Sequence, residues 1–166
     1  MAAYAANVAM YSPRFFLGRV VVDGLVIARP DNYLNQRSTL GGEGRLRGQP
    51  SAILLGANLL AFNAELRSRP LHVLASQLGG ALFFDAGDAF DAWPAQPKST
   101  AGIGLRAVLP QLDRNVIRLD VGFPIVRTLG ADPVGFYIAI EQAFSSKSPD
   151  APNGLIIPAN AGALGQ

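Results

Sequence analysis

The first feature whose residues could take part in binding or catalysis is a glycine-rich segment that carries arginine. Residues 40–50 read LGGEGRLRGQP, four glycines among two arginines, with no helical periodicity and no helix cap. Glycine lets a backbone turn tightly or approach another surface closely. Arginine presents a planar fork of donors that can pair with carboxylates in partly dry places. We therefore expect Arg47 to be carried on a loop towards an acidic partner.

Other chemistries fit these residues less well. No Gly-Lys-Ser/Thr follows the segment, so it does not resemble a phosphate-binding loop. A glycosidase pair of Glu65 and Asp85 would need a sugar cleft around it. The chain has one histidine and no cysteine, and no serine stands in a Gly-x-Ser-x-Gly turn. We predict no catalytic residue, metal or cofactor, and we do not expect an enzyme.

Composition narrows the class of protein that holds this segment. The chain has 166 residues, of which 49% are hydrophobic and 16% charged, against roughly 25% charged in typical soluble domains. No apolar run approaches the ~18 residues of a membrane helix. These values suit either a soluble protein with a large core or a membrane β-barrel. Twelve arginines and two lysines are dispersed along the sequence, so nucleic-acid binding is not supported.

Apolar residues alternate with polar ones along most of the chain, which is the pattern of β-strands. Turn-rich stretches separate the alternating runs, and residues 2–11 are a weaker strand candidate. We predict an all-β, antiparallel meander of about six or seven strands, with the clear runs at residues 19–28, 62–67, 81–90, 102–109, 117–125 and 135–144.

The polar faces of these strands favour a barrel over a soluble sandwich. They carry Arg, Asp, Glu and Gly, with hardly any Lys. Strand glycines such as Gly87, Gly102, Gly104 and Gly122 suit a curved sheet, or a sheet whose polar side another segment approaches. The apolar faces would then meet lipid. So few strands cannot close a membrane barrel, and open edges are not tolerated in hydrocarbon, so we expect these residues to be part of a larger barrel.

The order of motifs over residues 15–144 resembles the C-terminal half of the outer-membrane barrels of the BamA/TamA assembly-factor family, also called bacterial surface antigens. In that family a long loop with a Val-Arg-Gly-Tyr/Phe segment folds back into the lumen. Matching stretches follow in the family's order along the chain: GGEGRLRG at 41–48, NAELR with Glu65, FFDAG with Asp85 and Gly87, GIGLR at 102–106, RLDVGFP at 118–124, and FYIAIEQAF ending at Phe144. Gln49 stands where the family has its aromatic residue.

This resemblance implies a set of site residues. Arg47, followed by Gly48, would lock the loop to Glu65 and Asp85 inside the lumen, a mechanical role. Gly41, Gly42, Gly87, Gly102 and Gly104 would be structural glycines, and Arg67, Arg106, Arg118 and Asp120 lumen-facing charges. Phe136, Ile138, Ile140 and Phe144 would form the terminal-strand signal that the assembly machinery reads.

The resemblance also implies a function and a division of the chain. Residues 1–144 would be the C-terminal part of the barrel with a lumen loop at 30–52, and residues 145–166 an irregular tail. The implied activity is insertion and folding of β-barrel clients, or polypeptide translocation, in a bacterial outer membrane. Implied partners are outer-membrane lipid, unfolded clients, periplasmic POTRA domains and accessory lipoproteins. A two-partner secretion pore, the membrane anchor of a patatin-like lipase and a soluble β-sandwich binding module remain alternatives.

Overall fold

The computed structural model describes residues 2–42, 45–74, 76–109 and 115–142, and these residues are all-β. Ten strands follow one another along the chain: β1 (Tyr4–Tyr11), β2 (Gly18–Ala28), β3 (Ser38–Leu40), β4 (Leu54–Gly56), β5 (Asn58–Ser68), β6 (Leu71–Val73), β7 (Ser76–Phe90), β8 (Lys98–Leu109), β9 (Asn115–Val126) and β10 (Gly135–Gln142). Within the described residues there is no helix long and apolar enough to cross a bilayer.

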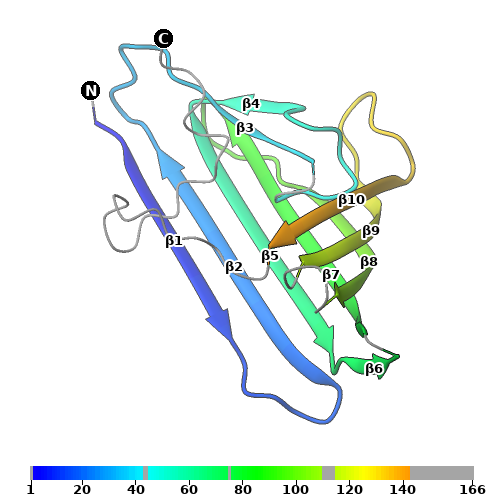
Figure 1. The fold of residues 1–166 in the computed structure, drawn as a ribbon. Helices are drawn as coiled ribbons and strands as arrows, with labels where there is room; N and C mark the ends of the chain where they lie inside the picture. The colour runs from blue at the N-terminus through cyan, green and yellow to red at the C-terminus, as the bar shows by residue number, and fades with distance from the viewer. Residues whose placement is uncertain (1, 43–44, 75, 110–114, 143–166) are drawn as a thin grey trace.

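One large antiparallel sheet contains most of these strands. Its order is β1-β2-β5-β7-β8-β9-β10, with β6 paired to β7, while β3 and β4 form a separate two-stranded hairpin. The sheet is strongly curved, so that β8, β9 and β10 turn round to face β2 and β5, but within the described residues it does not close (Figure 1). This confirms the predicted all-β, antiparallel meander of an incomplete barrel.

Several strands extend beyond the alternating runs that predicted them. β7 begins at Ser76 rather than at residue 81, and β5 covers Asn58–Ser68 rather than 62–67. The short strands β3, β4 and β6 were not predicted, since three residues are too few to show alternation. The loop expected at residues 30–52 runs from residue 29 to residue 57 and contains the β3–β4 hairpin. The predicted tail at 145–166 lies outside the described residues.

The convex face of the sheet is apolar and exposed. Strand register places alternate residues on the same side, so that Phe62, Phe84 and Ile103 all point away from the curve. Leu82 is 56% exposed and Phe136 is 75% exposed. Large exposed apolar residues continue across the face: Val8, Met10, Val26, Phe62, Leu82, Phe84, Ile103, Leu105, Leu119, Phe123, Ile125, Phe136, Ile138 and Ile140. These side chains do not form a core of their own, which is unlike a soluble sandwich.

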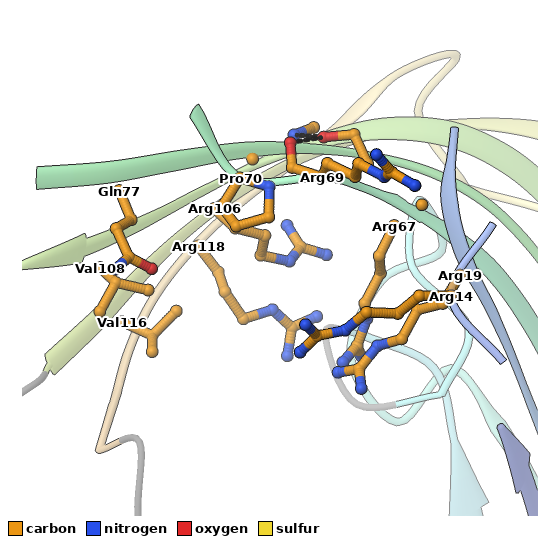
Figure 2. Close-up of a pocket in the computed structure, with 14 residues that line it drawn as sticks. Arg14, Arg19, Arg67, Arg69, Pro70, Gln77, Arg106, Val108, Val116 and Arg118 are labelled. Atoms are coloured by element: carbon orange, nitrogen blue, oxygen red, sulfur yellow. Dashed lines mark hydrogen bonds between the residues drawn. The ribbon is translucent and has the colours of Figure 1, made fainter. Parts of the chain in front are cut away.

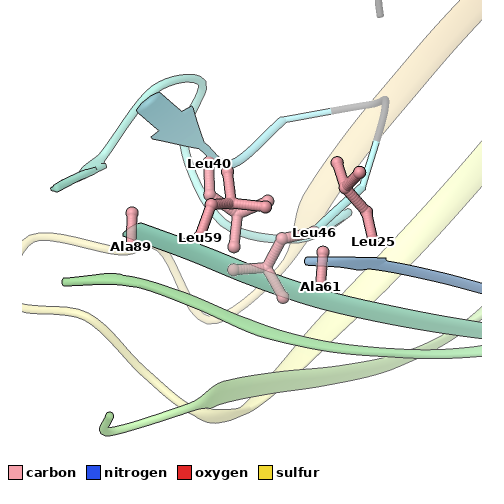
Figure 3. Close-up of a cluster of buried hydrophobic side chains, with 6 residues drawn as sticks. All are labelled: Leu25, Leu40, Leu46, Leu59, Ala61 and Ala89. Carbon is pink, nitrogen blue, oxygen red and sulfur yellow. The ribbon is translucent and has the colours of Figure 1, made fainter. Parts of the chain in front are cut away.

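The concave face is polar along only part of its length. The sequence predicted a polar inner side, but one end of it carries a cluster of buried apolar residues. The cluster consists of Leu25, Leu40, Leu46, Leu59, Ala61 and Ala89 (Figure 3). Alternation alone could not reveal it, because both faces of the strands are apolar at that end of the sheet.

Candidate functional site

The long loop between β2 and β5 is packed onto the concave face of the sheet. Its residues Leu40 and Leu46 enter the apolar cluster, where they meet side chains of β2, β5 and β7 (Figure 3). Leu46 is fully buried. Complete burial of a leucine contributes roughly 1.5–3 kcal/mol relative to exposure, so the loop has an apolar anchor directly before Arg47.

Arg47 pairs with both carboxylates that the sequence proposed for it. Its Nε and Nη2 donate to the two oxygens of Asp85, at 2.8 Å and 2.9 Å, which is the bidentate geometry of a guanidinium on a carboxylate. Its backbone N–H also donates to Asp85, at 3.1 Å. Its Nη1 donates to Glu65 Oε2 at 2.8 Å. Asp85 is 0% exposed and Arg47 only 4% exposed, so solvent screens these contacts little.

Two further residues contact this arginine, and a third, Asn63, holds its partner Asp85. Asp120, expected only as a lumen-facing charge, lies 3.4 Å from Arg47 Nη1. The Arg47 guanidinium stacks over the ring of Phe83, 3.6 Å from the ring centroid. Asn63 donates from Nδ2 to Asp85 at 2.9 Å and to the backbone carbonyl of Arg45 at 2.7 Å. We call Arg47, Glu65, Asp85 and Asp120 the arginine lock.

The charges around Arg47 keep it ionised. Burial alone would lower the pKa of Arg47, because a low-dielectric site disfavours charge. The hydrogen bond and charge of Asp85, followed by those of Glu65, outweigh burial, and the pKa of Arg47 is raised above its ordinary value. The guanidinium therefore keeps its charge throughout the pH range in which proteins are studied.

The predicted lumen-facing arginines connect to the lock from neighbouring strands. Arg67 Nε donates to Glu65 Oε1 at 2.8 Å, and Arg118 Nη2 donates to Asp120 Oδ2 at 3.0 Å. Arg106 pairs with Asp120 and lies 3.4 Å from Glu65. Glu65 and Asp120 thus each serve several arginines at once. Such shared pairing fixes side-chain geometry across β5, β8 and β9.

Glycines allow the loop to approach the sheet closely. Gly48 has a φ of +91°, in the left-handed region, and a side chain there would meet Thr100 Cγ2 at 2.6 Å. A Cβ on Gly122 would come within 2.8 Å of the Gly48 backbone, and one on Gly135 would do the same. On β8, Gly102 leaves room for the Phe83 ring and Gly104 for the contact between Asp120 and Arg106.

Comparison with known protein families shows which family the chain belongs to. A family model described as the Omp85 superfamily domain matches residues 31–144. The chain belongs to the Omp85 superfamily. Proteins of this superfamily are in general outer-membrane proteins, and the superfamily is one of insertion and secretion. No curated protein and no solved structure matches the chain.

The match to the Omp85 domain covers every residue of the arginine lock. It begins inside the long loop, and it ends at the residue predicted as the terminal aromatic signal, Phe144. Phe144 itself lies outside the described residues. The other residues of that predicted signal, Phe136, Ile138 and Ile140, are exposed on the convex face of β10. β1 and β2 precede the matched span but belong to the same sheet.

Gln49 has a role in this Omp85 domain that sequence reasoning missed. It is fully buried, its Nε2 donates to the Val126 carbonyl at 3.1 Å, and its Oε1 accepts from Thr128 N–H at 3.3 Å. Its backbone carbonyl accepts from the hydroxyl of Tyr137 at 2.7 Å and from Gly42 N–H at 3.1 Å. Gln49 therefore ties the loop tip to β9, to the residues after it and to β10. The signal in the sequence was that Gln49, a polar residue, stands where the family has an aromatic residue.

The remaining predicted glycines lie around the loop. Gly41 and Gly42 both have positive φ, and Gly42 forms an isolated bridge with Leu46 that closes the glycine-rich segment on itself. Gly87 on β7 leaves space for Leu40. The site of this Omp85 domain thus consists of buried carboxylates paired to arginines under a tightly packed loop. Its contacts are suited to holding the loop in one position.

Proposed function

We propose that this chain is the C-terminal part of an outer-membrane β-barrel of the BamA/TamA type, which folds and inserts other β-barrel proteins. The observation that supports it most is the arginine lock, which joins an Omp85-family loop to three strands, two of them through the carboxylates that the family resemblance indicated. The proposed role is mechanical rather than catalytic. A fixed loop keeps the concave side in one shape while the strands accommodate a client.

The edge of the sheet supplies the means of engaging that client. β10 pairs with β9 on one side and lies at the end of the described sheet on the other. An unpaired strand edge is a template on which another extended chain can form backbone hydrogen bonds. In this proposal, β10 forms one side of a weak seam, and outer-membrane lipid, unfolded clients, POTRA domains and accessory lipoproteins are the partners.

Client folding tests this function directly. The full-length protein that contains this chain, reconstituted in liposomes, should accelerate the appearance of a folded, protease-protected outer-membrane client relative to empty liposomes. An unrelated water-soluble protein should show no such protection. Export of a polypeptide into the vesicle lumen without insertion of a barrel client would instead favour a secretion pore of the same superfamily.

The placement of the convex face in lipid is tested by a charged substitution. Leu82→Arg puts a guanidinium on the exposed convex face of β7, between Leu66 and Ile103. We expect a loss of about 2–4 kcal/mol in the free energy of unfolding in liposomes if the site lies near the bilayer midplane. Leu129→Arg, a matched change in the exposed loop between β9 and β10, should cost little. Equal small losses for both variants would place the convex face in water.

A further inference from the structure

A cavity lined by arginine occupies the concave side of the sheet at the end opposite the long loop. Its volume is about 730 Å³. It lies where β2 begins and β5 ends, whereas the long loop joins the other ends of these two strands. Six of the twelve arginines of the chain line it: Arg14, Arg19, Arg67, Arg69, Arg106 and Arg118. In Figure 2 the guanidinium groups of Arg14, Arg19, Arg67 and Arg118 point towards a common space.

The strand register concentrates positive charge there. Arg19 lies directly opposite Arg67 across β2 and β5, and Arg106 directly opposite Arg118 across β8 and β9. Like charges in directly opposed positions destabilise a sheet unless they are balanced. Two such pairs in one cavity indicate that a negative partner contributes to this part of the molecule.

The carboxylates nearby supply part of that balance. Glu65 pairs with Arg67 and Arg106, and Asp120 pairs with Arg106 and Arg118, but both acids also contact Arg47 of the lock. In the part of the chain that the structure describes, no salt bridge involves Arg14, Arg19 or Arg69. Nor does any Asp or Glu of the described residues line the cavity.

Two of these three arginines are held in place by other contacts. Arg69 Nε donates to the Phe15 carbonyl at 3.1 Å, and the Arg19 guanidinium lies 5.9 Å from the centroid of the Tyr11 ring. The first contact attaches the residue after β5 to the turn between β1 and β2, and the second joins β2 to β1. They orient the guanidinium groups without neutralising them, so the cavity retains a net positive charge.

We propose that this cavity binds an acidic segment of polypeptide through its carboxylate groups. The inference rests on the proposed function, because a client chain would supply that segment. Arginine forks match carboxylates in bidentate pairs, and a cavity of this size is far larger than one small anion needs. A lipid headgroup fits less well, because the guanidinium groups lie on the concave face and the apolar side chains on the opposite one.

Peptide binding to the reconstituted full-length protein tests the proposal. The probe is a short fluorescent peptide of alternating glutamate and glycine, and its counterpart has glutamine in place of glutamate. We expect binding of the glutamate peptide only, weakened by added salt because the contacts are ionic. The double substitution Arg14→Gln with Arg69→Gln should weaken it about tenfold or more, since each removes a charged hydrogen-bonding group.

Matched variants separate this site from general charge. Arg37→Gln with Arg127→Gln removes the same charge from two exposed loop positions that do not line the cavity, and should leave peptide binding unchanged. Arg14→Gln alone is a second test and should also weaken peptide binding. Arg14 makes no hydrogen bond within the described residues, so its loss should not disturb the fold. Thermal unfolding verifies that each variant is folded.

Several outcomes would overturn the proposal. These are equal binding of the glutamine peptide, equal loss in the two double variants, and displacement of the peptide by inorganic phosphate or by an oligonucleotide at the same ionic strength. Loss of peptide binding in vesicles of anionic lipid, with binding kept in zwitterionic vesicles, would assign the cavity to headgroups instead. Client folding without peptide binding would remove this inference and leave the proposed function. Peptide binding without client folding would remove the proposed function and leave the cavity as a site for acidic polypeptide.

Discussion

Replacement of Arg47 by alanine is expected to lower the free energy of unfolding by about 3–5 kcal/mol, the usual cost of breaking a buried ion pair by removing one partner. Asp85, which is 0% exposed, would lose the two hydrogen bonds that the Arg47 side chain donates to it, and Glu65 would lose one. The backbone N–H of residue 47 could still donate to Asp85 if the loop keeps its position, and part of the attachment would then remain. Denaturant unfolding of the protein in liposomes measures the loss.

The loop should also become accessible in this variant. With the guanidinium gone, the glycine-rich segment is held by Leu40, Leu46 and the contacts of Gln49. We expect faster protease cleavage between residues 29 and 57 at a denaturant concentration where the parent protein stays intact. Arg47→Lys should give an intermediate loss, because an ammonium group cannot form the bidentate pair with Asp85.

Two comparisons make the result interpretable. Arg37→Ala removes an exposed arginine of the same loop whose contact to Asp91 is 3.6 Å, and surface pairs contribute little. A loss in Arg47→Ala no larger than that in Arg37→Ala would show that the lock does not hold the loop. Asp85→Ala added to Arg47→Ala should recover part of the loss, because no unpaired carboxylate would remain buried at that position.

The sequence predicted the main strands because these depend on short-range patterns, and the family resemblance implied Glu65 and Asp85 as partners of Arg47. Alternation over 19–28 identified β2 almost to the residue, and alternation over 62–67 and 81–90 placed Glu65 and Asp85 each on the polar face of its strand. The start of β7 was missed because the residues from Ser76 to Gly80 include two glycines and do not alternate clearly. β6 was missed because its three residues show no period.

Features that depend on register and curvature could not be predicted. Arg19 and Arg67 are far apart in sequence and meet only because β2 and β5 pair with that register. Asp120 reaches Arg47 because the sheet curves until β9 faces β5 (Figure 1). The arginines therefore look dispersed in the sequence but converge in the fold. The leucines under the loop could not be told from lipid-facing leucines, since only the folded loop covers them.

The second large effect on stability is expected where the backbone of Gly48, at the loop tip, packs against Gly122 of β9. Gly48→Ala should lower the free energy of unfolding by roughly 2–5 kcal/mol, as the sum of a left-handed backbone penalty and an overpacked contact. The new Cβ would lie 2.6 Å from Thr100 Cγ2 and 3.1 Å from the carbonyl carbon of Gly122. One of these neighbours is backbone within a strand and cannot move aside without loss of pairing, so we expect the loop tip to be displaced.

The opposite side of this contact and an open strand position supply the matched variants. Gly122→Ala would place its Cβ 2.8 Å from both N and Cα of Gly48, so it should reproduce the loss and the faster cleavage of the loop. Gly24→Ala changes a strand glycine whose Cβ would meet nothing within 4 Å, and it should alter stability by no more than about 0.5 kcal/mol. If Gly48→Ala and Gly122→Ala behave like Gly24→Ala, the loop tip is not packed against β9, and Arg47 alone carries the attachment.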